Sequence, residues 1–195
     1  SGRVNRIATS FPNVKGAPGD AAVLTGNPVR GDIIAIGAEP YSTPADGAAI
    51  NLLIFGGSQG ARIFSDVVPA AIAALPDDLR QRGRIVQQER PEDLERVQTA
   101  YAAANQQAEI ASFFNDMPDR FRTAHLVIAR SGASTVAELA AAGRPAILIP
   151  YAAALDDHQT ANAAALVETG GAWLLPEANM TAAAMAKLLT EILAA

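Results

Sequence analysis

The chain has 195 residues, a formal net charge of -5 and a sequence pI of about 5.0. Half of the residues are apolar and 18% are charged, which favours a folded globular protein over a disordered one. There is no cysteine and there are two histidines, which excludes disulfides, thiolate metal sites and a histidine-based metal cluster. The acidic balance, with no basic stripe, argues against nucleic-acid binding. No apolar run approaches the roughly 20 residues that cross a bilayer.

The first 50 residues show the least regular pattern. Residues 6–14 suggest a short strand that ends in a proline turn. Residues 25–30 carry the Gly and Asn-Pro pattern that is typical of a linker, and the Pro- and Gly-rich stretch 37–47 predicts a surface loop.

From Ala49 onward, short apolar runs alternate with helix-forming stretches. The predicted strands are 50–55, 84–89, 109–114, 125–130, 145–151 and 172–177. A helical segment follows each, the clearest being 91–104, 134–143, 156–170 and 181–195. Continuous apolar strands in such alternation are typical of a parallel sheet with helices on both faces. We therefore predict an α/β fold, doubly wound and Rossmann-like, with about six parallel strands.

Two Gly-rich or small-residue loops follow predicted strands, where ligands bind in open parallel sheets. The first is "GGSQGAR" (56–62), in which Gly56 and Gly57 allow close backbone approach and Ser58 offers a hydroxyl. Its spacing matches neither the dinucleotide fingerprint nor a P-loop. A tight strand-to-helix turn explains the spacing equally well.

The second loop is "RSGASTVAE" (130–138). Thr135 and Glu138 are three residues apart and fit a helix capping box. Alternatively, the loop N–H groups and Thr135 face a diphosphate, while Glu138 accepts hydrogen bonds from a ribose diol. Capping leaves Arg130 and the small residues 131–133 unexplained, so both interpretations stay open.

A third candidate is "DDHQTAN" (156–162). Either acid could cap the following helix, with His158 and Gln159 solvated, and spacing alone favours that interpretation. The alternative places Gln159 over the hydroxyls of a sugar. His125, at the start of a predicted strand, is interpreted as structural. The sequence has no Ser-His-Asp order and no paired-carboxylate motif, and we expect neither a metal nor a cofactor.

Taken in order, five motifs closely resemble the C-terminal half of the MurG family of glycosyltransferases: "TGNPVR", "GGSQGAR", "FFNDM", "RSGASTVAELAAAGRPAILIPY" and "DDHQTANA". The resemblance covers the chain from about residue 4. It implies transfer of N-acetylglucosamine (GlcNAc) from UDP-GlcNAc to lipid I in peptidoglycan synthesis. It also implies the GT-B fold, in which two Rossmann-like domains face a cleft.

The resemblance implies roles for matching residues. The backbone of Phe114 would hold the uracil edge, Arg130 would close the base side of the pocket, and Glu138 would bind the ribose. Gln159, with His158 beside it, would contact the GlcNAc hydroxyls, although the family often has Gln where His158 stands.

The remaining implied residues contact the donor diphosphate or lie beside it. The α-phosphate site would comprise Thr135 and the N–H groups around Ala133 and Ser134. Arg30 and Ser58 would contact the diphosphate, and Gln59 belongs to the same substrate-binding loop as Ser58.

The family is nearly twice as long as this chain. The resemblance implies that residues 1–29 are the tail of the N-terminal acceptor domain and a linker, and that 30–195 form the UDP-GlcNAc-binding domain. The acceptor loop, the proposed base and the membrane patch, which places the family on the cytoplasmic face of the inner membrane, would belong to the other domain. We therefore expect a fragment that binds donor without a catalytic residue of its own. Alternatives are a related transferase with another sugar or lipid, or a non-catalytic nucleotide-sugar-binding module.

Overall fold

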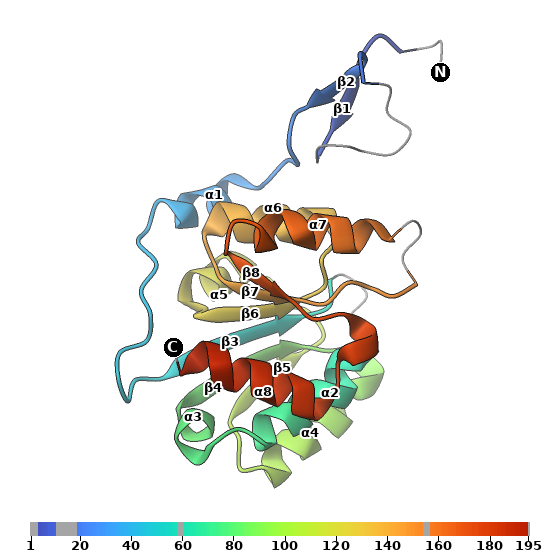
Figure 1. The fold of residues 1–195 in the computed structure, drawn as a ribbon. Helices are drawn as coiled ribbons and strands as arrows, with labels where there is room; N and C mark the ends of the chain where they lie inside the picture. The colour runs from blue at the N-terminus through green and yellow to red at the C-terminus, as the bar shows by residue number, and fades with distance from the viewer. Residues whose placement is uncertain (1–3, 11–18, 58–60, 154–156, 195) are drawn as a thin grey trace.

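The centre of the protein is a six-stranded parallel sheet in the order β5-β4-β3-β6-β7-β8 (Figure 1). The computed structural model describes residues 4–10, 19–57, 61–153 and 157–194. The six strands are β3 (Ile50–Phe55), β4 (Gly83–Gln88), β5 (Ala108–Ala111), β6 (Leu126–Ala129), β7 (Ala146–Leu148) and β8 (Ala172–Leu174). All five neighbouring pairs are parallel, which confirms the predicted sheet.

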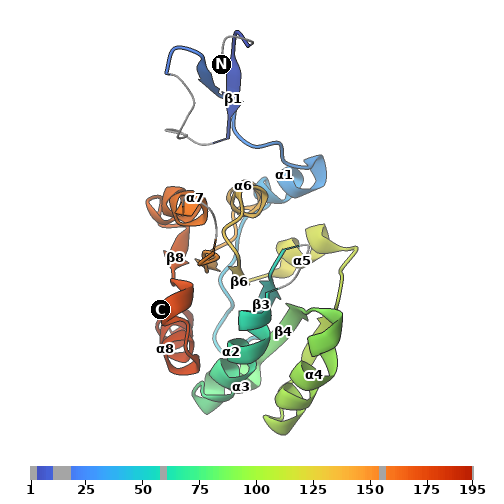
Figure 2. The same cartoon turned by 90° about the vertical axis from the view of Figure 1, so that its right-hand side faces the viewer.

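Helices cover both faces of this sheet, as predicted (Figure 2). One layer contains α2 (Arg62–Ala73), α3 (Asp77–Arg82), α4 (Leu94–Ala103) and α8 (Ala182–Leu193). The other contains α1 (Gly31–Gly37), α5 (Met117–Thr123), α6 (Ala133–Ala142) and α7 (His158–Val167). Two 3-10 turns, η1 (Pro91–Asp93) and η3 (Glu177–Asn179), follow β4 and β8.

The apolar run of β3 shows why its strand was predictable. Leu52 and Ile54 pack in the core cluster under α2 and α8, whereas Leu53 and Phe55 pack in the cluster under α1, α5 and α6. Successive side chains of a strand point to opposite faces, so a strand covered on both sides has to be apolar at every position.

The N-terminal segment forms a separate parallel pair, β1 (Ile7–Thr9) with β2 (Ala22–Leu24), in the register Ile7↔Ala22. Figure 1 shows it standing away from the main sheet, joined to α1 by residues 25–30. The short strand predicted within 6–14 is therefore confirmed at 7–9. The helix α1, with Ile33 and Ile36 buried, lies in a part of the chain for which no helix was predicted.

The helix α1 packs closely on α6 at its last residue, Gly37. A Cβ atom added there would lie 2.1 Å from the carbonyl oxygen of Ala141. A backbone oxygen cannot rotate away as a side chain can, so glycine is required at this contact. The two helices are therefore in close backbone contact at this position.

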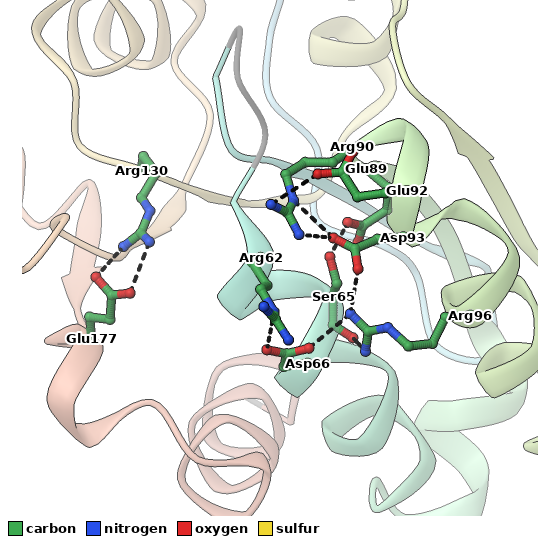
Figure 3. A network of polar contacts seen from close by, with 10 residues as sticks. All are labelled: Arg62, Ser65, Asp66, Glu89, Arg90, Glu92, Asp93, Arg96, Arg130 and Glu177. Atoms are coloured by element: carbon green, nitrogen blue, oxygen red, sulfur yellow. Dashed lines mark hydrogen bonds and ion pairs between the residues drawn. The ribbon is translucent and has the colours of Figure 1, made fainter.

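A buried polar network joins α2 to the end of β4, next to the carboxyl edge of the sheet (Figure 3). The Glu89 side chain, 1% exposed, accepts hydrogen bonds from Ser65 Oγ and Gln87 Nε2, and Tyr101 donates to Gln87 Oε1. Burial raises the pKa of Glu89 above its usual value, and the hydrogen bonds from Ser65 and Gln87 offset only part of this effect. Burial therefore makes Glu89 easier to protonate than an exposed glutamate, and the hydrogen bonds of the network act against this effect.

Around it, charged side chains alternate in sign. Arg96 Nη2 lies 2.8 Å from both Asp66 and Asp93, and Arg90 Nη2 lies 2.6 Å from Asp93. These ion pairs connect α2, η1 and α4 to one another. The start of α2 and Arg90 are thereby fixed relative to the sheet.

Replacing Gly37 by alanine is expected to destabilise the fold by about 1–3 kcal/mol, the usual cost of overpacking. The control is Gly31→Ala at the other end of α1, where an added Cβ meets nothing within 4 Å. Urea unfolding monitored by circular dichroism measures both. Equal stability of the two variants would show that α1 can shift on α6 at little cost.

Glu89→Gln is expected to gain stability relative to the wild type as the pH rises from about 4 to 7. The pKa of Glu89 in the folded state lies above the usual 4.5. Below pH 4.5 Glu89 is protonated in both the folded and the unfolded states, so its ionisation does not lower the stability of the wild type. The penalty of ionisation grows as the pH rises through the folded pKa, and a glutamine does not ionise. Unfolding free energies at the two pH values test this, with the exposed Glu168→Gln as control. A stability difference between Glu89→Gln and the wild type that does not change with pH would contradict this prediction.

Candidate functional site at the carboxyl edge of the sheet

A cleft of about 590 Å³ opens at the carboxyl edge of the parallel sheet. Every wall comes from a segment that follows a strand of this sheet, as expected for a ligand site in this class of fold. Its described lining residues are Gly56, Gly57, Ala61, Arg62, Ile63, Arg90, Arg130, Gly132, Ser134, Thr135, Tyr151, Gln159 and Glu177.

One wall is the start of α6, and it corrects the capping-box interpretation. The helix begins at Ala133 with Gly132 at the N-cap position, and no side chain caps it. Thr135 is therefore the third residue of the helix and not its cap. Gly132 has no side chain to accept a hydrogen bond, so the first-turn N–H groups remain for another acceptor. A helix start of this kind attracts anions.

Arg130, at the end of β6, lines the same cleft, and several contacts hold its side chain. Its Nη1 lies 2.9 Å from Glu177 Oε2, and its Nη2 lies 3.1 Å from Glu177 Oε1. Nη1 also donates to the carbonyl oxygen of Pro150 at 3.2 Å. The guanidinium carbon lies 5.2 Å from the centre of the Tyr151 ring and 5.5 Å from that of Phe64. These contacts fix the plane of the guanidinium.

Glu177 also holds the loop that follows β7. Its Oε2 accepts the N–H of Ala152 at 2.9 Å. Burial acts to raise the pKa of Glu177, but the hydrogen bonds from Arg130 and Ala152 and the charge of Arg130 outweigh it, so the pKa lies below its usual value. Glu177 is therefore a carboxylate at neutral pH.

At the start of α7, Gln159 lines the cleft, and its Oε1 accepts the Tyr151 N–H at 2.9 Å. Asp157 occupies the N-cap position, but its side chain does not cap the helix and instead accepts a hydrogen bond from Thr160. His158, the first residue of α7, is not among the described lining residues. Asp156 lies outside the described residues. The capping interpretation of this motif is thus wrong for Asp157.

The structure brings Glu138 and Arg30 together, although neither is among the described lining residues. Arg30 Nε lies 3.5 Å from Glu138 Oε1, and the Glu138 side chain is 23% exposed. Arg30 precedes α1, and Glu138 lies one turn beyond Thr135 on α6. The ribose-binding and diphosphate-binding roles predicted for them remain predictions.

Phe114 lies on the connection after β5 with its side chain buried. The Arg120 guanidinium stands 3.8 Å above its ring, and Arg120 is itself held by Glu109 at 2.6 Å and Asp116 at 2.8 Å. A side chain packed in this way is not offered to a ligand. Any ligand contact at Phe114 would therefore use its backbone, which is the role predicted for it.

Among the polar and aromatic lining residues of the cleft, four had been given no role: Arg62, Arg90, Tyr151 and Glu177. The last three stand at or directly after the end of a predicted strand, so the rule that ligands bind at carboxyl ends gives a signal for them. Ser58 and Gln59 lie outside the described residues. Ala133 begins α6 beside the cleft.

His125 has the structural role that was predicted. It lies at the amino end of β6, away from the cleft, and its Nδ1 accepts the N–H of Asn51 at 2.9 Å. Burial, and then the charge of Arg144, lower its pKa. Within the ranges that the structure describes, no group of three or more His, Asp or Glu side chains is placed to hold a metal ion. No helix of these ranges is long and apolar enough to cross a membrane.

Comparison with known proteins agrees with this geometry. A solved structure of MurG from Acinetobacter baumannii superposes with a TM-score of 0.77 at 32% sequence identity, covering 97% of this chain and 52% of that one. The doubly wound fold is thus also that of a GT-B glycosyltransferase.

Two relatives share the name UDP-N-acetylglucosamine--N-acetylmuramyl-(pentapeptide) pyrophosphoryl-undecaprenol N-acetylglucosamine transferase. The protein from Rhodospirillum centenum is 51% identical over 194 residues, which are 98% of this chain and 51% of the relative. The protein from Paramagnetospirillum magneticum is 53% identical over 195 residues, with coverages of 98% and 53%. The chain spans about half the length of the relatives it matches.

The model of the glycosyltransferase family 28 C-terminal domain matches residues 51–195. This range contains the whole six-stranded sheet apart from the first residue of β3, together with every described wall of the cleft. The match confirms the resemblance drawn from the sequence motifs, and this chain therefore belongs to glycosyltransferase family 28.

Proposed function

We propose that this chain is the donor-binding half of an inverting hexosyltransferase that transfers GlcNAc from UDP-GlcNAc to lipid I, forming lipid II for peptidoglycan. The names of the two relatives support this pair of substrates. The observation that carries the proposal is the cleft, because it gathers four residues, from the segments that follow β6 and β7, that the motifs had assigned to the donor. They are Arg130, Ser134, Thr135 and Gln159.

Within this cleft, the start of α6 is the place for the donor diphosphate. Its first-turn N–H groups are uncapped by side chains, and the Thr135 hydroxyl stands beside them. Gly56 and Gly57 face the same space and allow close backbone approach. Gln159, on α7, is assigned to the hydroxyls of the sugar, which is the group attached to the diphosphate in the donor. Arg130 and the backbone at Phe114 are assigned to the base, and Glu138 to the ribose.

In the proposed reaction the acceptor hydroxyl attacks the anomeric carbon, and the bond from that carbon to the diphosphate oxygen breaks. UDP leaves with the electron pair, so negative charge develops on the diphosphate. The α6 N–H groups and the Thr135 hydroxyl are placed to stabilise that charge, and such fixed dipoles are usually the largest catalytic contribution.

The acceptor side is assigned to the other half of the relatives. Residues 1–29 are proposed to belong to the acceptor domain and its linker, and residues 30–195 to the donor domain. Binding of lipid I, the catalytic base and peripheral contact with the cytoplasmic face of the inner membrane would all lie with that other half.

Calorimetric titration of the chain is expected to show saturable binding of UDP and UDP-GlcNAc, with GDP and NAD much weaker. The reason is that backbone groups at Phe114 would match the uracil edge and not a purine. Equal affinity for all four ligands would contradict the assignment of the uracil site to the backbone at Phe114.

The same preparation, incubated with UDP-GlcNAc and a soluble lipid I analogue, should form no disaccharide. Aligning two reactants can supply about 7–11 kcal/mol of barrier lowering, and a chain that holds one of them does not supply it. Acceptor-dependent turnover at an ordinary rate would place the catalytic machinery within these 195 residues.

Glu138→Ala is expected to weaken UDP about ten- to a hundredfold, since lost hydrogen bonds to a charged group cost roughly 1.5–3 kcal/mol. The midpoint of thermal unfolding should change little, because the pair with half-exposed Arg30 is worth about 0–1 kcal/mol. Glu168→Ala, at the far end of α7, is the matched control. A Glu138→Ala chain that melts early yet binds UDP normally would assign Glu138 to the fold instead.

A further inference from the structure

The charge of Arg130 is neutralised inside the cleft. Its two terminal nitrogens face the two oxygens of Glu177 at 2.9 and 3.1 Å, a bidentate arrangement with a side-chain exposure of 11% for Arg130 and 22% for Glu177. Pairs of this geometry are strong and directional. The remaining contacts of Arg130, to backbone carbonyls and two aromatic rings, leave its plane fixed.

Glu177 differs from every other described lining residue of the cleft because it is the one carboxylate among them. The other two cationic lining residues, Arg62 and Arg90, are paired with carboxylates outside the cleft, namely Asp66, Glu92 and Asp93. A carboxylate within a site for an anionic ligand opposes binding of that ligand nearby. Glu177 therefore places its negative charge beside Arg130, and no described lining residue places one at the start of α6.

Two groups of lining residues, those at the start of α6 and those around Arg130, therefore offer different chemistry. The start of α6 presents N–H groups and hydroxyls without a described carboxylate beside them, which suits a diphosphate. Around Arg130 the lining consists of a guanidinium whose charge is balanced, together with the Tyr151 ring, and a planar base can pack against such groups. An unpaired arginine there would instead compete with α6 for the diphosphate.

We infer that Glu177 is a specificity-determining residue that masks the charge of Arg130, so that the diphosphate of a nucleotide binds at α6 and the base binds against Arg130. The ligand class in this inference rests on the proposed function. Glu177 acts through Arg130 and touches neither reacting atom, so it is a positioning residue.

The test compares Glu177→Gln with the wild type, using inorganic pyrophosphate and UDP as separate probes at low salt. The glutamine keeps the size of the side chain and an oxygen for the Ala152 N–H, but it removes the charge. Pyrophosphate is expected to bind roughly tenfold more tightly, the size of one charge-assisted contact. The ratio of UDP affinity to pyrophosphate affinity should fall by at least as much, because the diphosphate gains a second, misplaced partner.

Two further variants make the result specific. Glu168→Gln removes an exposed carboxylate far from the cleft and controls for net charge. The double variant Arg130→Met with Glu177→Met replaces the pair by apolar groups, which folds commonly tolerate even where half of a buried pair is not tolerated. It has no charge to unmask, so its pyrophosphate affinity should equal that of the wild type while UDP weakens.

A general loosening of the cleft would weaken both probes, so tighter pyrophosphate binding is a readout that a purely structural role does not give. Unchanged or weaker pyrophosphate binding by Glu177→Gln overturns the inference. Equal tightening in Glu168→Gln, or no pyrophosphate binding by the wild type, also overturns it. A wild type that binds pyrophosphate but not UDP would refute the proposed donor, while the pyrophosphate comparison would still decide the role of Glu177.

Discussion

Burial of the sheet on both faces is the constraint on which the rest of the structure depends. With α2, α4 and α8 on one side and α1, α5, α6 and α7 on the other, neither face of β3 or β6 can offer polar groups to a ligand. Backbone groups without partners occur at the strand ends and helix starts. The cleft follows from this arrangement, since its walls are the segments that leave the carboxyl ends of the strands.

The charged side chains near the cleft are held in place by one another. Arg90 and Arg96 share Asp93, and Asp66 links Arg96 to Arg62 (Figure 3). Burial of Glu89 below them adds a polar group that has to keep its partners on α2 and β4. These ion pairs contribute less to stability than to geometry, because they restrict where the side chains of Arg62 and Arg90 can lie in the cleft.

The sequence predicted the sheet well because its strands carry unbroken apolar runs, as in "INLLIF" at β3. It did not predict α1, which is seven residues long and has two buried apolar positions in a Gly- and Pro-rich region. The helix start at α6 was misplaced because the rule for capping residues points to Thr135, whereas the chain uses Gly132. A helix start without a capping side chain breaks the local rule, and functional sites are where such rules fail. The pairing of Arg130 with Glu177 joins residues 47 apart, which no spacing rule reveals.

The close contact of Gly37 with Ala141 has a mechanical consequence. Because α1 cannot slide on α6, and Arg30 at its start is paired with Glu138, α1 moves as one body with the helix that forms the diphosphate wall. If the β1–β2 pair rotated relative to the main sheet, the change in backbone angles would have to occur before Arg30. The stretch 25–29 is without regular structure there, and Gly26 has a φ of +75°. Any such rotation would thus be confined to about five residues, and it would leave the shape of the cleft unchanged.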